Sequence, residues 1–134
     1  MDECIFCKIV KGEIPCHKVY ENTDVLAFLD IKPHAQGHTV VIPKLHAETL
    51  FELPDIKGKP MMDAIRKVME KLKQKLSCDG FNVGWNHNSV AGQVVPHLHI
   101  HVLPRYNGDG GGSIHSIIKN QGNMSVDEIA KKFK

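Results

Sequence analysis

The stretch VVPHLHIHVLPR, residues 94–105, alternates histidine with apolar residues and predicts a central strand of the fold. Successive side chains of a β-strand point to opposite faces, so the pattern predicts a strand over 97–104 with one apolar face. The other face carries His97, His99 and His101 at strict period two. Three interpretations compete: a polar outer face that happens to use histidine, a metal site, and nucleophilic or acid–base chemistry on a phosphate.

The spacing of this histidine row favours a substrate over a single metal ion. Neighbours on one face of a strand are roughly 6.6 Å apart, whereas the ligands of one ion converge to about 2 Å from it. If an acceptor such as a carbonyl holds the Nδ1–H of the middle imidazole, its Nε2 is free to attack phosphorus. We therefore expect His99 to be the nucleophile and His101 to stabilise charge on the phosphate.

Other stretches predict the elements around this strand. Apolar residues at helical spacing predict a short helix over 4–11 and a long helix over 59–76. The remaining strands are expected at 17–21, 24–30, 37–43 and 79–88. Short connections favour antiparallel pairing, and the long helix must cover one face. We expect one α+β domain over 1–134, with an antiparallel five-stranded sheet. A flexible Gly-rich tail is expected over 106–134, ending in a short helix capped by Ser125.

The composition narrows the class of protein. The 134 residues carry a formal net charge of +2, which argues against a nucleic-acid groove, because such grooves need a clustered basic face. No stretch approaches the roughly 18 apolar residues that cross a bilayer. The N-terminal residues, acidic first and then interrupted by lysines, are unlike a signal peptide. A cytoplasmic protein without membrane or specific nucleic-acid partners is expected, and its four cysteines are expected to be thiols or metal ligands.

Cys4 and Cys7 form a C-x-x-C pair. Such a pair is a redox centre, half of a zinc site or chance, and the βαβ context of redox pairs is missing here. A closed tetrahedral zinc site needs two further ligands, for which His46 and His97 are candidates.

Four stretches together resemble the histidine-triad (HIT) family. They are HLHIHVL at 97–103, CIFCKIVKGEIP at 4–15, VLAFLDIKPHAQGHTVVIPKLH at 25–46 and AGQVVPHLHIHVLPRYNGD at 91–109. The resemblance implies a small α+β protein, usually a dimer whose two sheets join side by side. It also implies transfer or hydrolysis of nucleotidyl groups through a covalent nucleotidyl-histidine. The implied substrate is a purine nucleotide that contains AMP, and the chemical step requires no metal.

The resemblance also implies roles for particular residues. It implies that His99 is the nucleophile, that His101 contacts the phosphate and that His38 is a further active-site histidine. The positions that it assigns to the nucleotide are Ile5, Phe6, Ile9 and Phe28 at the base, Asp30 and Ile31 at the ribose, and Asn86, Gln93, Val94 and Val95 around the phosphate. Taken alone, the two phenylalanines are explained more simply as core. The zinc-binding bacterial and archaeal members of the Hint-like branch imply the metal ligands Cys4, Cys7, His46 and His97.

Val94 departs from the family's pattern. In the phosphoramidate-hydrolysing branch, the residue two after the loop glycine is typically a serine that helps the leaving group, whereas valine cannot donate a proton. The stretches GQxVxH and LPR also resemble the dinucleoside-polyphosphate branch, whose phosphate leaving group needs less protonation than an amine. The expected substrate is therefore a nucleoside phosphoramidate or a dinucleoside polyphosphate. The alternative is a non-catalytic nucleotide-binding protein, or a zinc-stabilised interaction protein, on the same fold.

Overall fold

A computed structural model describes residues 3–134 of the chain. Residues 1 and 2, part of the expected domain and of the N-terminal stretch judged unlike a signal peptide, lie outside the described residues. The strands are β1 Lys18–Glu21, β2 Val25–Leu29, β3 Thr39–Pro43, β4 Gly80–Gly84 and β5 Ile100–Arg105. The α-helices are α1 Ile5–Val10, α2 Gly58–Leu76 and α3 Val126–Ala130. Short 3₁₀ turns are η1 Leu50–Glu52, η2 Asp55–Lys57, η3 Ser89–Ala91, η4 Ile114–Ser116 and η5 Lys131–Phe133.

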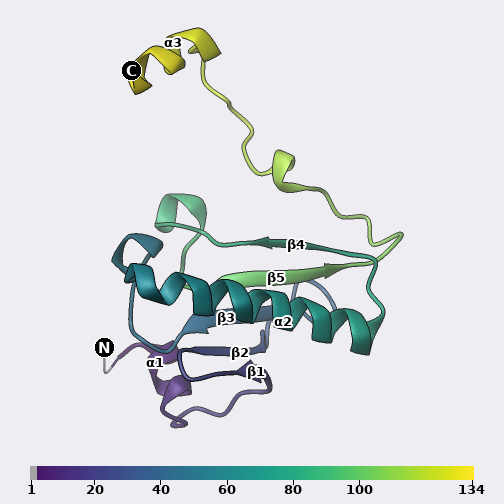
Figure 1. Ribbon diagram of the computed structural model, residues 1–134. Helices are drawn as coiled ribbons and strands as arrows, with labels where there is room; N and C mark the ends of the chain where they lie inside the picture. Colours follow the sequence, from purple (N-terminus) through teal and green to yellow (C-terminus); the bar gives the residue numbers. More distant parts are fainter. Residues whose placement is uncertain (1–2) are drawn as a thin grey trace.

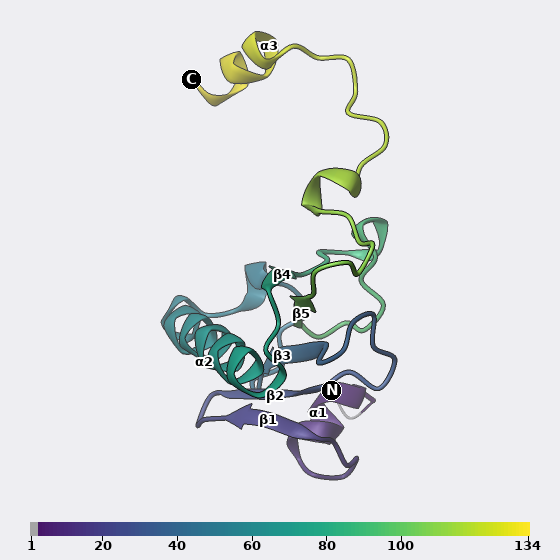
Figure 2. The ribbon, with the colours of Figure 1, turned by 90° about the vertical axis from the view of Figure 1, so that its right-hand side faces the viewer.

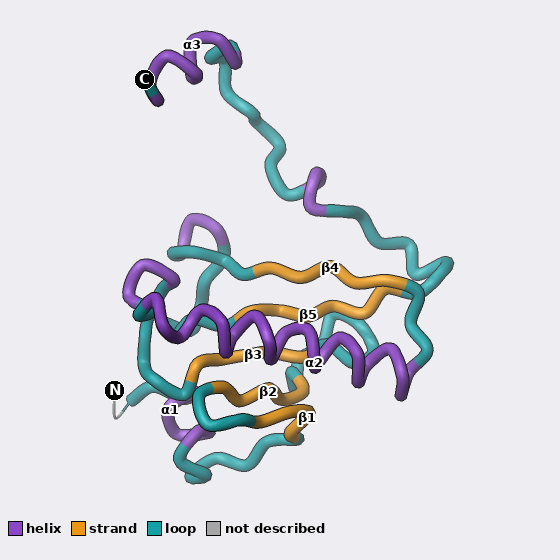
Figure 3. The backbone as a smooth tube through the Cα atoms, viewed as in Figure 1, coloured by secondary structure: helices purple, strands orange, loops and turns teal. Residues whose placement is uncertain are grey.

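The five strands form one sheet in the order β1-β2-β3-β5-β4, with every neighbouring pair antiparallel (Figures 1 and 3). The predicted α+β class and the antiparallel five-stranded sheet are thus confirmed. β5 lies between β3 and β4, so the part of the histidine stretch from Ile100 onward runs through the interior of the sheet. Within the described residues 3–134, no helix is both long and apolar enough to cross a membrane.

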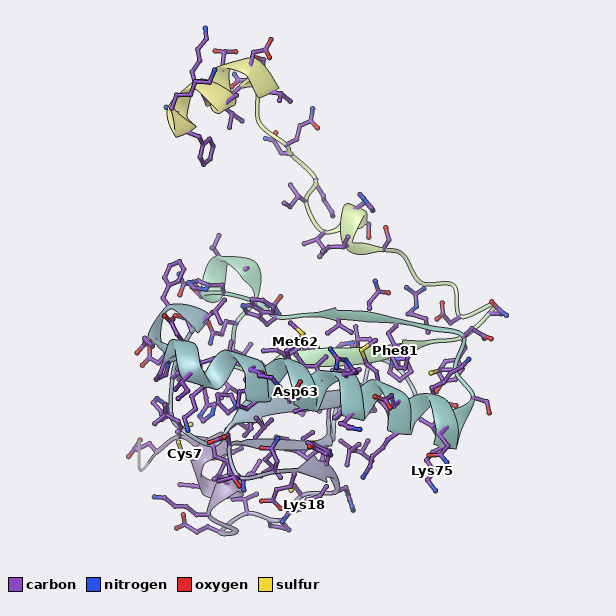
Figure 4. All side chains as sticks on the ribbon, in the orientation of Figure 1. Cys7, Lys18, Met62, Asp63, Lys75 and Phe81 are labelled. Carbon is purple, nitrogen blue, oxygen red and sulfur yellow. The ribbon has the colours of Figure 1, made fainter. Side chains whose placement is uncertain are left out.

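The long helix α2 covers one face of the sheet (Figure 2). Its apolar stripe buries Met61, Ala64, Val68 and Leu72 against the sheet. Leu98, Ile100 and Val102 belong to the same core, which is the apolar face predicted for the histidine stretch. Residues of α2 away from this stripe, such as Met62 and Lys75, are exposed on its outer side (Figure 4). A continuous hydrophobic core of this kind holds the strand ends in fixed positions.

The short helix α1 lies against the opposite face, over β1, β2 and β3 (Figure 2). Leu26, Phe28, Val40 and Ile42 are buried there, and Phe6, Ile9 and Val10 of α1 pack against them. α1 does not reach across β5 and β4, whose side of this face stays open. The second face therefore has a covered half and an open half, and the histidines lie along the boundary.

Several predicted boundaries were wrong. The strand expected at 79–88 ends at Gly84, and the one expected at 37–43 begins at Thr39. The triad strand was placed at 97–104, but β5 begins at Ile100. The backbone N–H of His97 donates to Val95 O at 2.8 Å and that of Leu98 to Ala47 O at 2.7 Å, so neither pairs with β3. The first helix was placed at 4–11, but Cys4 is its N-cap and Lys11 its C-cap.

The predicted terminal helix is present as α3, and the Ser125 hydroxyl accepts from the Glu128 N–H in a capping box. Figure 1 shows α3 and the segment before it extending away from the sheet and α2. Flexibility of this tail remains a prediction.

Candidate active site and metal centre

The three histidines lie on the face opposite α2, as the alternation predicts. His97 and His99 are buried and His101 is partly exposed. The Phe6 ring of α1 meets both His97 and His99 edge-on, with ring centroids 5.8 and 5.1 Å apart. The His99 and His101 rings are 5.1 Å apart. Each ring, however, has different hydrogen-bond partners.

His97 turns one nitrogen toward the protein backbone and the other toward two cysteines. Its Nε2 lies 2.8 Å from the carbonyl oxygen of Pro43. A carbonyl only accepts, so Nε2 carries the proton and Nδ1 presents a lone pair. That Nδ1 lies 3.4 Å from the Cys4 Sγ and 3.6 Å from the Cys7 Sγ. A ring held in this way by a backbone carbonyl is the usual arrangement of a metal-ligating histidine.

The donor atoms around His97 have the spacing of a tetrahedral metal site. Cys7 Sγ is also 3.2 Å from the Nδ1 of His46, and all four donors of Cys4, Cys7, His46 and His97 lie within 4.8 Å of one another. Metal–sulfur bonds of about 2.3 Å and metal–nitrogen bonds of about 2.0 Å imply sulfur–nitrogen edges of about 3.5 Å in a tetrahedron. The observed distances match these edges. The predicted residues can therefore hold a metal ion, between α1 and the histidine stretch.

His99 has the opposite proton arrangement. Its Nδ1 lies 2.7 Å from the carbonyl oxygen of His97, so Nδ1–H donates to that carbonyl. The Nε2 of the neutral ring is then unprotonated, as a nucleophile requires. Because the acceptor is the backbone of His97, the metal centre and the candidate nucleophile share one residue.

His38 and His101 form a hydrogen-bonded chain with a fixed direction. The backbone N–H of His34 donates to the Nδ1 of His38 at 3.1 Å, so neutral His38 carries its proton on Nε2. That Nε2 lies 2.9 Å from His101 Nδ1 and therefore donates to it. His101 is left with its proton on Nε2, where it is a hydrogen-bond donor. Asp30 Oδ2 lies 3.6 Å from the His38 Nε2.

Gly37 determines the backbone conformation immediately before His38. Its φ is +88°, and a Cβ there would collide with the Leu76 side chain. The backbone therefore needs glycine immediately before this histidine.

Asp30, His38 and His101 are close enough together to resemble a second metal site. The hydrogen bond from the His34 N–H opposes that interpretation. It places a proton on the His38 Nε2, which is the atom that would have to bind the ion. These three side chains are better suited to holding and orienting protons.

The His38 and His101 imidazoles are both neutral at physiological pH. Burial, followed by the neighbouring His99 and His38 rings, lowers the pKa of His101 to about 4. Burial also lowers the pKa of His38, against the opposing charge of Asp30. Neutral His101 therefore presents an N–H donor at Nε2.

We expect the protein to lose thermal stability as the pH falls from about 6.5 toward 4. An imidazole whose folded pKa lies below its ordinary value binds fewer protons in the folded state, so acid favours unfolding by at most about 1.4 kcal/mol per pH unit for each proton. The melting temperature of His101→Gln should therefore decline less steeply than that of wild type over this range. Any metal loss in acid affects both proteins, so the difference between their slopes isolates His101. Parallel curves would contradict the assigned pKa.

The residues expected around the base and ribose differ in how exposed they are. Phe28 is fully packed in the core, whereas Phe6 and Ile9 are partly exposed along the covered half of the face. Ile5 is exposed at the start of α1, and Ile31 is exposed beyond β2. The Asp30 Oδ1 accepts from the Lys32 N–H at 2.8 Å, while Oδ2 faces His38.

The residues expected around the phosphate belong to the loop between β4 and β5. Gln93 uses its side chain to join this loop to the segment after β3: Nε2 donates to Val95 O of the loop and to Glu48 O of that segment, and Oε1 accepts from the Asn88 N–H of the loop. It therefore positions the loop backbone. Asn86 lies beside Gly92, whose φ of +106° turns the chain toward Val94. The Val94 side chain is 89% exposed.

Sequence reasoning missed the backbone groups that determine which ring nitrogen of His97 and of His38 carries the proton. They are the carbonyl of Pro43 and the N–H of His34. Backbone groups have no signature in residue identity, so only the three-dimensional arrangement reveals them.

A comparison with known protein families decides the family. Residues 11–108 match the HIT domain. The chain belongs to the HIT family. The match spans the whole sheet and α2, whereas the Cys4–Cys7 pair and residues after 108 lie outside it.

Relatives within the HIT family are similar over nearly the whole chain. A HIT-like protein of Methanocaldococcus jannaschii is 47% identical over 131 residues, which cover 98% of each chain. The adenosine 5'-monophosphoramidase of Schizosaccharomyces pombe is 43% identical over 98% of each chain. The crystal structure of a Bacillus anthracis HIT family protein has a TM-score of 0.85 at 39% identity and covers 98% of this chain and 93% of its own. A zinc-bound histidine-triad protein of Mycobacterium smegmatis has a TM-score of 0.77 at 38% identity, covering 81% and 79%.

Proposed function

We propose that this HIT protein hydrolyses or transfers nucleotidyl groups through a covalent intermediate on His99. The observation that carries the proposal is the hydrogen bond from the His99 Nδ1–H to the His97 carbonyl, which leaves Nε2 unprotonated. The name of the Schizosaccharomyces pombe relative supports a nucleotide substrate, with AMP as the transferred group.

The reaction has two displacements at the α-phosphorus. In the first, the His99 Nε2 forms a bond to phosphorus, and the leaving group departs with the electron pair of its bond and takes up a proton. In the second, water attacks phosphorus, breaks the phosphorus–nitrogen bond and loses a proton, which restores His99. His101 donates its Nε2–H to a phosphoryl oxygen while charge develops there, and within this proposal the backbone amides of Val94 and Val95 stabilise the same charge. Asp30 accepts hydrogen bonds from ribose hydroxyls.

A substrate panel with trapping of the intermediate tests this function. The protein is mixed for short times with an adenosine phosphoramidate or a diadenosine polyphosphate, quenched and digested. We expect one adenylyl group on the peptide that contains His99. Tight nucleotide binding without turnover or adduct would instead assign the non-catalytic binding function.

We further propose that the ion held by Cys4, Cys7, His46 and His97 is zinc. Two thiolates and two imidazoles at tetrahedral spacing suit this ion. The zinc-bound relative from Mycobacterium smegmatis supports the choice. Within this proposal the metal has a structural role: it fixes His97 and, through the His97 carbonyl, the Nδ1 proton of His99.

Val94→Ser should raise turnover of the phosphoramidate on the order of tenfold, because a hydroxyl can protonate an amine leaving group. Turnover of the dinucleoside polyphosphate should change little, since a phosphate leaving group needs less protonation. The Val94 side chain is exposed, so stability should be unaffected. Steady-state rates give the ratio of turnover on the phosphoramidate to turnover on the dinucleoside polyphosphate. Val90→Ser, on the neighbouring exposed turn, is the matched control. An equal gain on both substrates would contradict this role for position 94.

A further inference from the structure

Cys4 and Cys7 lie in a single turn at the start of α1, close enough to be joined to each other. Cys4 is the N-cap of α1, and its Sγ accepts the Cys7 backbone N–H at 3.4 Å. The Lys8 N–H donates to Cys4 O at 3.0 Å and closes the same turn. Both sulfur atoms face the His97 Nδ1 and lie within 4.8 Å of each other. A disulfide bridges Cα atoms about 4.4–6.8 Å apart, a span that residues three apart around a helical turn satisfy.

The two thiols lie just beneath the surface. Cys4 and Cys7 keep 8% and 7% of their area exposed, whereas Cys78 keeps none. Ile5, which lies between them in the sequence, is 46% exposed, and Glu3 is exposed as well. Figure 4 shows Cys7 beside α1, at the margin of the molecule. A molecule as small as hydrogen peroxide therefore has a short path to this pair.

The metal centre proposed above makes this pair reactive and makes its reaction consequential. Metal ligation keeps cysteine sulfur as thiolate, which is also the form that attacks peroxide. Two of the four ligands are these sulfur atoms, and the other two are the imidazoles of His46 and His97. A site that loses both thiolates keeps only half of its ligands and no negative charge.

We propose that Cys4 and Cys7 form an oxidation site, at which hydrogen peroxide converts the two thiolates into a disulfide and expels the bound ion. This inference rests on the proposed metal centre and is independent of the chemistry at His99. The βαβ context of a disulfide oxidoreductase is not required, because the reaction alters the chain's own metal site and no other protein.

The oxidation proceeds in two balanced steps. One thiolate sulfur attacks a peroxide oxygen, the oxygen–oxygen bond breaks, and a sulfenic acid and a hydroxide ion form. The second thiolate then attacks the sulfenic sulfur, so that the sulfur–sulfur bond forms and a second hydroxide leaves. Each sulfur has lost one electron, each peroxide oxygen has gained one, and the two hydroxides take up protons from the solvent to give water.

Oxidation at this site also changes how α1 is held against the histidine stretch. The Cys7 Sγ lies 3.2 Å from the His46 Nδ1, and both sulfur atoms face His97. A disulfide replaces these contacts with a bond inside α1. Phe6, between the two cysteines, meets the His97 and His99 rings edge-on. The helix then keeps its apolar contacts with the sheet but loses its attachment to His46 and His97, and the Phe6 packing loosens with it.

The test treats the zinc-loaded whole chain with increasing amounts of hydrogen peroxide. A chelating dye measures the released ion, and peptide mapping follows residues 1–8, a tryptic peptide that holds both cysteines. We expect this peptide to lose the mass of two hydrogen atoms, with one ion released for each disulfide formed. A phosphine reductant with added zinc should reverse both changes. Amide exchange of α1 into deuterated water should become on the order of tenfold faster after oxidation, since α1 then opens more readily.

Cys16→Ser is the matched control, because it removes a partly exposed thiol outside the cluster and should respond as wild type does. Oxidation of Cys16 while Cys4 and Cys7 remain thiols and the ion stays bound would overturn this inference alone and leave the metal centre standing. Ion release without the disulfide, or unchanged exchange of α1 after oxidation, would overturn it as well. A chain that binds no ion, or that forms the disulfide and keeps its ion, would overturn both the ligand assignment and this inference. The adduct on His99 is tested separately, so each of these failures is distinguishable from failure of the nucleotidyl chemistry.

Discussion

His99→Ala should lower turnover by at least about 10³-fold, the largest effect expected for any single change in this protein. The His99 Nε2 is the unprotonated ring nitrogen that the hydrogen bond to the His97 carbonyl leaves available. Alanine removes the nucleophile without touching His101, His38 or Asp30, so nucleotide affinity should change by less than tenfold. Single-turnover assays with an adenosine phosphoramidate measure the rate, and calorimetry with AMP measures binding.

His115→Ala is the matched control, because this histidine is exposed and its Nδ1 lies 3.3 Å from the Ser113 hydroxyl, outside the triad. It should leave the rate unchanged. Turnover in His99→Ala within tenfold of wild type would remove the covalent intermediate from the mechanism. Loss of both binding and turnover, with normal folding, would show that His99 acts in binding instead.

Cys7→Ser should lose the bound metal and lower the melting temperature by about 10 °C or more. The Cys7 Sγ lies 3.2 Å from the His46 Nδ1 and 3.6 Å from the His97 Nδ1, so its loss opens the tetrahedron. The ion binds only the folded chain, and its binding free energy therefore adds to stability. A loss of several kcal/mol in a domain of this size corresponds to a shift of that order. Metal analysis by mass spectrometry and thermal melts provide the two measurements.

Cys16→Ser is the matched control, because Cys16 is a partly buried thiol that packs against the core outside the cluster. It should keep its metal and nearly all its stability. Equal metal content in Cys7→Ser and wild type would refute the assigned ligands. Metal loss with an unchanged melting temperature would refute the structural role of the ion.

The sequence predicted which residues meet in the candidate site better than it predicted the hydrogen bonds between them. Strict alternation located His97, His99 and His101 on one face, because side-chain direction in extended backbone depends only on parity. The C-x-x-C pair with His46 and His97 was also found, and these donors do converge. The strand boundary was wrong because Leu98 donates to Ala47 O outside β3, a long-range choice that local pattern does not encode.

Gln93 shows why residue roles were harder to predict than residue positions. A glutamine next to a phosphate loop suggests contact with the substrate, but its amide is committed to three backbone groups, two in the loop and one, the Glu48 carbonyl, in the segment after β3. The C-terminal segment, residues 113–134, was harder still. Its apolar residues recur without a buried partner in the chain, so the pattern that predicts a helix gives no surface for it.

The proposed metal centre also has a consequence for the order of steps during synthesis and folding. Its ligands are far apart in the sequence, since Cys4 and His97 are separated by 93 positions. A ribosome must have released most of the chain before the last ligand can reach the first. If the proposed ion binds here, its loading joins the first segment to emerge to one that emerges only after most of the chain. Under the proposed mechanism, the His97 carbonyl that holds the Nδ1 proton of His99 would be fixed at that same stage.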